Sequence, residues 1–221
     1  MRQPVDSPRI AVVDYGAGNL VSIEQALIAV GATPSRATRP GDLRDAAGLV
    51  VPGVGAAGPA MERLRAADLV DPIRDWIAAD RPFLGICLGL QLLFEGSDED
   101  GAETLGVLAG RTRRLEDAPT VPHIGWNQVE RRREHPLFDR IGDGADFYFV
   151  HSYAGVPDAD LSSAVTVAET EHGRRFASAV ARGSLAGVQF HPERSGGDGL
   201  ILLGNFAALV RAHVDGVEVP A

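Results

Sequence analysis

Two short segments of this sequence carry residue types that together can cleave an amide. The first holds the sole cysteine, Cys87, between Gly85 and Gly89. The second is His191-Pro192-Glu193. A thiolate nucleophile needs a base that accepts and returns a proton, and a further group that orients this base. We therefore predict that Cys87, His191 and Glu193 form the catalytic triad of an acyl-transfer enzyme.

The residues around Cys87 predict a tight turn between a strand and a helix. An apolar run at 83–87 precedes the turn, and Gln91-Leu92-Leu93-Phe94 follows it. A cysteine on such a turn lies at a helix N-terminus, which favours the reactive thiolate. Side chains in place of Gly85 and Gly89 would obstruct the turn. A lone intracellular cysteine is more often a small core residue, but the flanking glycines favour the nucleophile.

His191 follows the apolar run 187–190, so we expect it to leave the sheet at the same edge as Cys87. Glu193 comes two residues later and is placed to orient the imidazole. The tripeptide alone has low specificity, and the chain has six histidines. Polar or turn-like surroundings predict that three of the others lie on the surface: His135, His172 and His213. The competing candidates for the base are His123 and His151.

A second turn, Pro52-Gly53-Val54-Gly55, ends the apolar run 48–51. Its glycines, Gly53 and Gly55, allow a backbone N–H to turn toward an oxyanion, and Val54 lies between them. Acyl transfer requires such a donor. The N–H of Leu88, next to the nucleophile, is a second candidate donor. Pro-Gly turns also end strands without any catalytic role, but the position one strand–helix unit before Cys87 favours an oxyanion site.

The order of apolar segments predicts an α/β fold with a mostly parallel central sheet, flanked by helices, and an additional antiparallel sheet. In the first half we expect strands at 9–14, 48–51 and 83–87, and helices at 20–30, 59–69 and 72–79. In the second half we expect strands at 107–115, 124–131, 146–153, 164–170 and 174–181, a hairpin at 171–173 and a last helix at 200–210. Ligands of such folds bind at the carboxyl ends of the strands. We expect residues 1–221 to form a single domain.

Composition excludes several classes of function. Lys and Arg number 21 against 30 Asp and Glu, which gives a net charge of −9 and disfavours nucleic acid or anionic membranes as partners. The basic run 131–133 is more typical of a solvated turn. A single cysteine excludes an internal disulfide and a multi-cysteine metal site, and we expect no metal and no cofactor. No apolar stretch reaches the about 20 residues that span a bilayer, and Pro4, Asp6 and Pro8 do not fit a signal peptide, so the cytoplasm is the expected compartment.

With these motifs in this order, the sequence resembles the class I, triad-type glutamine amidotransferases, and in particular the glutaminase subunits of imidazole glycerol phosphate synthase. Further blocks carry the resemblance: Asp14-Tyr15-Gly16-Ala17-Gly18-Asn19, Pro122-His123-Ile124-Gly125-Trp126-Asn127 and Phe147-Tyr148-Phe149-Val150-His151-Ser152-Tyr153. The resemblance implies hydrolysis of glutamine to glutamate and ammonia. It also implies a separate (β/α)8-barrel cyclase subunit, which receives the ammonia through a tunnel in histidine biosynthesis.

The resemblance assigns roles to individual residues. Gly53 and Val54 match a mobile oxyanion strand, which implies that the subunit is nearly inactive without its partner. His151 would support the site rather than react. Arg194 stands where the family commonly has lysine, and Ala57 where an aromatic residue is frequent. Four residues match positions that contact glutamine: Gln91, Glu99, Ser152 and Tyr153. Three match the surface that faces the cyclase: Trp126, which we expect in an exposed turn, Asn127 and Arg194.

Three other functions compete with this interpretation. The chain could be the glutaminase of another ammonia-channelling synthase, such as that of pyridoxal phosphate, but the blocks at 122–127 and 147–153 argue against it. It could be a non-catalytic binding module of the same fold, but all three triad residues are present. It could also be a cysteine hydrolase of the related peptidase type. Reaction of the thiol with a glutamine-like electrophile at neutral pH would separate a glutaminase from the last two.

Overall fold

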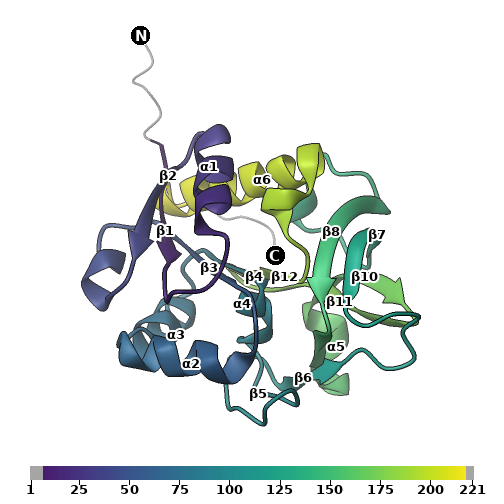
Figure 1. Ribbon diagram of the computed structural model, residues 1–221. Helices are drawn as coiled ribbons and strands as arrows, with labels where there is room; N and C mark the ends of the chain where they lie inside the picture. The colour runs from purple at the N-terminus through teal and green to yellow at the C-terminus, as the bar shows by residue number, and fades with distance from the viewer. Residues whose placement is uncertain (1–6, 218–221) are drawn as a thin grey trace.

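The computed structural model describes residues 7–217. Within this range a nine-stranded sheet has the order β2-β1-β3-β4-β12-β11-β10-β7-β8 (Figure 1). Pairing is parallel from β2 to β12 and antiparallel from β12 to β8. The strands are β1 (Arg9–Val13), β2 (Thr33–Ala37), β3 (Gly48–Gly53), β4 (Phe83–Cys87), β7 (His123–Arg131), β8 (Ala145–His151), β10 (Thr166–His172), β11 (Arg174–Arg182) and β12 (Leu185–Val188). The predicted absence of a signal peptide concerns mainly residues 1–6, which lie outside the described residues.

A smaller sheet is built from β5 (Gly96–Ser97), β6 (Gly110–Arg114) and β9 (Tyr153–Pro157). It lies beside the large sheet, next to the short helix α5 (Ala159–Val165) (Figure 1). The predicted fold class is therefore confirmed. The hairpin predicted at 171–173 is also present, because His172 pairs with Arg174 across Gly173, whose φ is 79°.

Helices cover both faces of the parallel half of the sheet. Helices α1 (Leu20–Ala29) and α6 (Gly196–Val214) lie on one face, and α2 (Ala57–Ala66) and α3 (Val70–Ala78) lie on the other (Figure 1). Successive residues of β1 point to opposite faces of the sheet, and each face has its own hydrophobic core. Ile10 packs with α1 and α6, and Ala11 packs with α2 and α3. Burial on both faces explains why the sequence shows continuous apolar runs rather than alternation.

Short elements connect these layers. Helix α4 (Leu88–Gln91) follows β4 directly, and the 3-10 turns between residues 7 and 217 are η1 (Pro40–Leu43), η2 (Pro136–Phe138) and η3 (Pro192–Arg194). The ends of β3, β4 and β12 lie at one edge of the sheet, because Gly53 pairs with Cys87 and Val188 pairs with Ile86. Residues that follow these three strands therefore meet in one place.

Several predicted boundaries differ from the structure. The expected strand 146–153 is two strands, since β8 ends at His151 and β9 begins at Tyr153 in the other sheet. The expected strand 164–170 begins as the end of α5, and the expected strand 107–115 is shorter. Strand β2, whose residues are Thr-Pro-Ser-Arg-Ala, was not predicted. This strand lies at the edge of the sheet, where polar residues and proline are tolerated.

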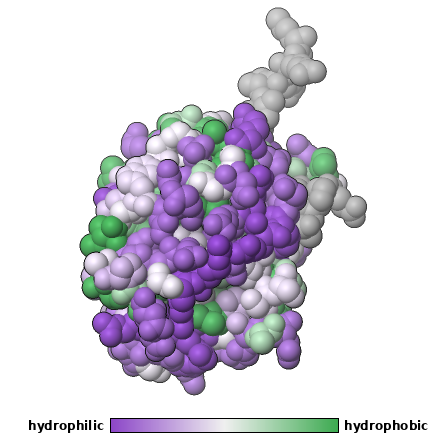
Figure 2. Space-filling model, turned by 90° about the vertical axis from the view of Figure 1, so that its right-hand side faces the viewer, coloured by the Kyte–Doolittle hydropathy of each residue, from purple (hydrophilic) through white to green (hydrophobic). Residues whose placement is uncertain are grey.

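The face at the right of Figure 1 is mainly hydrophilic, with scattered hydrophobic side chains (Figure 2). Two arginines of the basic run 131–133 are held in ion pairs: Arg132 Nε lies 2.6 Å from Glu169 Oε2, and Arg131 Nη1 lies 3.3 Å from Glu134 Oε2. The third, Arg133, donates from Nη2 to the Ala181 carbonyl at 3.1 Å. None of the helices within residues 7–217 has the length and apolar character needed to cross a membrane.

Candidate active site

Cys87 lies at the junction of β4 and α4 in a strained conformation. Its φ is 54° and its ψ is −107°, a region that side chains rarely adopt. The glycines on either side make this turn possible by close packing. A Cβ atom on Gly85 would lie 2.6 Å from the carbonyl oxygen of Gly89, and one on Gly89 would overlap the carbonyl oxygen of Val51. The predicted strand–turn–helix is therefore present, and both glycines are required by contact.

His191 and Glu193 form a buried pair beyond the end of β12. Glu193 Oε1 accepts a hydrogen bond from His191 Nδ1 at 2.9 Å, and the two side chains are 1% and 6% exposed, respectively. The backbone holds the histidine in place, since its N–H donates to the Tyr148 carbonyl at 2.9 Å and its carbonyl accepts from Ser195 Oγ at 2.6 Å. The Nε2 atom makes no hydrogen bond within residues 7–217, so it is available to a proton-transfer partner.

The surroundings of His191 favour the imidazolium form. Burial alone would lower its pKa, but the interactions with Cys87 and Glu193 outweigh burial and raise the pKa of His191 to about 10. A protonated imidazole beside a sulfur atom is the arrangement that stabilises a thiolate. The same proton is then available for a leaving amine.

We expect His191 to remain protonated at pH 7–8 in the resting protein, and Glu193→Gln to lower its titration midpoint by about one pH unit or more. Because the pKa of the folded state lies above the ordinary value of 6.5, the stabilisation is complete below pH 6.5 and is lost as the pH rises toward 10. NMR of ¹³C,¹⁵N-labelled histidine rings measures this midpoint.

His151 serves as the internal control, because burial lowers its pKa to about 3 and its ring stays neutral over the same range. A His191 ring that titrates near pH 6.5 in the wild type, or one unaffected by Glu193→Gln, would contradict the assignment.

The two competing histidines are engaged elsewhere. His151 Nδ1 lies 2.8 Å from the carbonyl oxygen of Tyr153, and its Nε2 lies 3.0 Å from His123 Nδ1. Burial lowers the pKa of His123 to about 4. Neither ring has a free nitrogen directed at the sulfur, which leaves His191 as the candidate base.

The prediction that three further histidines lie on the surface was partly wrong. His135 is buried, its Nδ1 accepts the Leu137 N–H at 3.1 Å, and burial lowers its pKa to about 4. His172 is half-buried, and its ring stacks on His123 with 4.0 Å between ring centroids. His213 is exposed as predicted.

A cavity of about 290 Å³ opens beside the sulfur. It has room for a molecule of amino-acid size. Partial burial and the neighbouring Asp100 raise the pKa of Glu99, which lines this cavity. The cavity brings together Cys87 and all four residues predicted to contact the substrate: Gln91, Glu99, Ser152 and Tyr153.

The predicted oxyanion turn borders the same cavity. Gly53 ends β3 directly beside Cys87, while Val54 and Gly55 line the cavity, and Gly55 has a φ of 90°. The predicted second donor, Leu88, is the buried first residue of α4. The turn thus lies within reach of a group bound to the sulfur.

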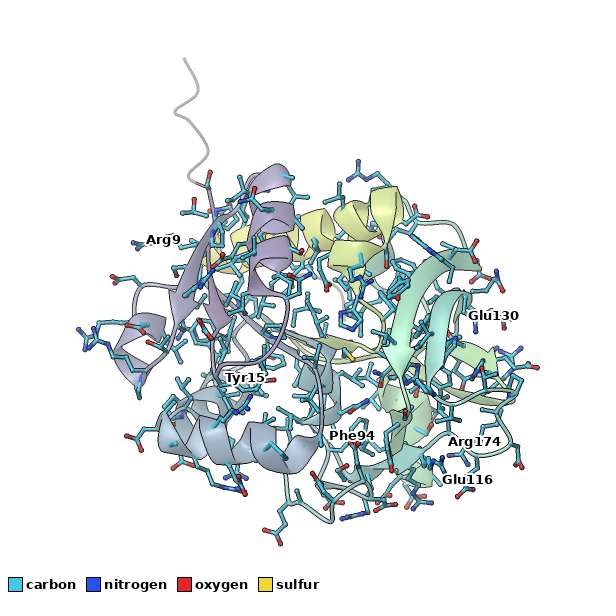
Figure 3. All side chains as sticks on the ribbon, viewed as in Figure 1. Arg9, Tyr15, Phe94, Glu116, Glu130 and Arg174 are labelled. Carbon is cyan, nitrogen blue, oxygen red and sulfur yellow. The ribbon has the colours of Figure 1, made fainter. Side chains whose placement is uncertain are left out.

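Tyr15 was missed as a residue that holds this turn. It lies just past β1, on the side of the sheet that α2 covers (Figure 3). Its hydroxyl donates to the Pro52 carbonyl at 2.9 Å. A Cβ atom on Gly53 would collide with the Tyr15 hydroxyl, so the two residues fit together. Burial, and then the nearby Cys87, raise the pKa of Tyr15, so it remains a neutral donor.

The residues predicted to face a partner divide into two groups. Trp126 is 57% exposed, as expected, but it lies on strand β7 rather than in a turn. Its ring meets Tyr148 at 6.1 Å between centroids, and Arg194 is stacked over Tyr148 at 4.1 Å. Asn127 instead turns inward, since its side-chain nitrogen lies 3.2 Å from His123 Nε2 and 2.9 Å from the Glu171 carbonyl.

Gln189 is a site residue that was not predicted from the sequence. It follows β12, is fully buried, and its Nε2 lies 3.6 Å from Cys87 Sγ. The signal in the sequence was a polar residue within an otherwise apolar run, two positions before His191.

Comparison with known proteins identifies the family to which this site belongs. The chain matches the class-I glutamine amidotransferase family over residues 11–207. It is 45% identical over 210 residues to imidazole glycerol phosphate synthase subunit HisH of Synechococcus elongatus (93% of this chain, 95% of the relative). It is 47% identical over 203 residues to the subunit of the same name from Moorella thermoacetica (91% and 95%).

Solved structures share the fold at lower sequence identity. A structure of PurLQS from Thermotoga maritima has a TM-score of 0.71 at 20% identity, and covers 90% of this chain and 97% of its own. A glutamine amidotransferase crystal structure has a TM-score of 0.69 at 21% identity (90% and 98%). The chain therefore belongs to the class I glutamine amidotransferases and, within them, to the HisH subunits of imidazole glycerol phosphate synthase.

Proposed function

We propose that this chain hydrolyses glutamine to glutamate and ammonia with Cys87 as nucleophile, His191 as general base and acid, and Glu193 as the group that orients His191. The observation that carries the proposal is the meeting of a strained cysteine and a buried histidine–glutamate pair at adjacent strand ends. The cavity beside the sulfur supports it further, because its volume of about 290 Å³ suits one amino acid.

In the first half-reaction, the Cys87 thiolate attacks the side-chain carbonyl carbon of glutamine. The negative charge moves to the carbonyl oxygen, where the N–H groups of Val54 and Leu88 would stabilise it. His191 then protonates the leaving nitrogen, ammonia departs and a glutamyl thioester remains.

In the second half-reaction, neutral His191 takes a proton from water as the water attacks the thioester carbonyl. The tetrahedral intermediate collapses, glutamate leaves, and the proton on His191 restores the thiolate–imidazolium pair. One water is consumed for each ammonia released. The four other cavity residues, Gln91, Glu99, Ser152 and Tyr153, would bind the rest of the substrate.

We further propose that the ammonia passes to a (β/α)8-barrel cyclase subunit. The relatives are named as subunits of a synthase, which supports an assembly. Trp126, Tyr148 and Arg194 form a partly exposed cluster that would meet this partner. The exposed Ile124, at 60%, extends it with apolar surface. The cytoplasm, where biosynthetic glutamine is available and a single thiol stays reduced, is the proposed compartment.

The test is ammonia release from glutamine by this chain alone, by the chain mixed with its cyclase, and by the mixture with the cyclase's own ligand. We expect little release from the chain alone and a large increase in the full mixture, because the partner would bias the turn at 53–55 toward its oxyanion-binding conformation. Equal rates with and without the cyclase would reject partner activation, and no release in any mixture would reject the glutaminase assignment.

A further inference from the structure

The side chain of Gln189 is a buried polar group in direct contact with the nucleophile. It is 0% exposed, and its amide nitrogen lies 3.6 Å from Cys87 Sγ. The strand pairing explains this position, because Val188 lies opposite Ile86 and the next residue of each strand falls at the same height. Burial of an amide is costly unless its hydrogen bonds are satisfied, so its partners define what it does.

A backbone carbonyl fixes which end of Gln189 faces the sulfur. Gln91 Nε2 lies 2.8 Å from the Tyr153 carbonyl oxygen, which can only accept, so the Gln91 nitrogen is correctly placed as the donor. The same nitrogen lies 3.1 Å from Gln189, which must therefore present its oxygen there. The nitrogen of Gln189 is left to point at Cys87. The two amides thus have one consistent orientation, and it directs an N–H at the sulfur.

The Tyr153 carbonyl is in turn held by a chain of histidines. His151 Nδ1 must donate to it, so His151 Nε2 accepts from His123 Nδ1 at 3.0 Å. His123 Nε2 then accepts from Asn127 Nδ2 at 3.2 Å. Both rings are neutral, as this order of donors requires. This order of donors and acceptors fixes the tautomer of both His151 and His123 along the path from Asn127 on β7 toward the sulfur on β4.

We propose that Gln189 is a further catalytic residue, which donates a hydrogen bond to the Cys87 sulfur and holds the thiolate in line for attack. The proposal deepens the glutaminase function proposed above and rests on it. The donor stabilises the thiolate before attack, loses importance while sulfur is bound in the thioester, and acts again on the thiolate that leaves during hydrolysis. Gln91 orients Gln189, and because both of its own N–H groups are used, Gln91 offers the substrate only its oxygen.

The test is the pH dependence of Cys87 alkylation by iodoacetamide in the isolated full-length chain. In Gln189→Met we expect the midpoint of the pH–rate profile to move up by about one pH unit, and kcat for glutamine with the cyclase present to fall about tenfold. Gln91→Met should move the midpoint less, because Gln189 keeps its own N–H. Gln128→Met, at an exposed amide on β7, is the matched control and should leave the profile unchanged.

His191 and Tyr15 interact electrostatically with Cys87, and Glu99 lines the same cavity; all three are unchanged in these variants. An unchanged midpoint in folded Gln189→Met, or equal shifts in Gln189→Met and Gln91→Met, would overturn the proposal, since a purely structural role predicts equal shifts. If Gln189→Met fails to fold, the contact can still be tested by NMR on the wild-type protein. The ¹⁵N–¹H signal of the Gln189 side chain must shift on alkylation of Cys87, and an unmoved signal would reject the contact.

Alkylation does not require turnover of glutamine. Failure of the glutaminase assignment would therefore appear as absent ammonia release, while failure of the Gln189 assignment would appear as an unmoved alkylation profile.

Discussion

Glutamine hydrolysis is expected to fall by at least about 10⁴-fold when Cys87 is replaced by serine. The serine hydroxyl ionises far less readily than the thiol, so the resting thiolate–imidazolium pair is lost and no other nucleophile replaces it. Cys87 is the only cysteine in the sequence and is 5% exposed. The hydroxyl oxygen of the serine is only slightly smaller than the sulfur that it replaces. The measurement is ammonia release at saturating glutamine in the presence of the cyclase.

Two controls make this loss specific to the chemistry. The urea midpoint of Cys87→Ser should stay close to that of the wild type, because the substitution removes almost no volume from the core. The double variant Cys87→Ser, His191→Asn should be hardly slower than either single variant, since residues that act as one unit are not additive. Activity of Cys87→Ser within about tenfold of the wild type would show that the nucleophile lies elsewhere.

The parallel half of the fold and the turn at Cys87 could be predicted from the sequence because their determinants are local. A strand buried on both faces must be an apolar run, as at 48–51 and 83–87, and a nucleophile turn needs small residues at fixed distances. Gly85 and Gly89 meet this need through contacts within a few residues and with the adjacent strand. Such constraints leave a direct trace in the sequence.

The second half was harder because the determinants are not local. The segment 146–153 has one continuous strand-like composition, yet the chain leaves the large sheet after His151 and enters the small one at Tyr153. The Ser152 carbonyl at this break accepts the N–H of Leu115, a residue far away in sequence. No glycine or proline marks the change of sheet, so periodicity alone could not reveal it.

Buried polar residues were also misjudged, for a related reason. His135 stands in a polar stretch but caps a 3-10 turn inside the core, and Gln189 stands in an apolar stretch but reaches the sulfur. Whether a polar side chain faces water or a partner depends on segments brought together by the fold. The triad pattern predicted that His191 and Glu193 lie near Cys87, but it did not predict that the Gln189 amide contacts the sulfur.

The second large effect concerns stability: Gly89→Ala is expected to lower the free energy of unfolding by at least about 3 kcal/mol. Alanine is otherwise favoured over glycine in a helix by about 1 kcal/mol, so helix propensity alone predicts the opposite sign. The added Cβ would overlap the carbonyl oxygen of Val51 in β3, which is backbone and cannot rotate away. The chain must then separate α4 from β3 or distort the turn at Cys87, and glutamine hydrolysis should fall with stability. Urea denaturation measures the first effect and ammonia release the second.

Gly142→Ala provides the matched control, because a Cβ atom there would meet nothing within 4 Å and its backbone does not require glycine. We expect its stability to remain within about 0.5 kcal/mol of the wild type. If Gly89→Ala were as stable as Gly142→Ala, the close approach of α4 to β3 would not be needed to form the nucleophile turn. The strain at Cys87 would then have another origin. A stable but inactive Gly89→Ala would instead show that the turn can relax without unfolding, and that catalysis depends on its unrelaxed geometry.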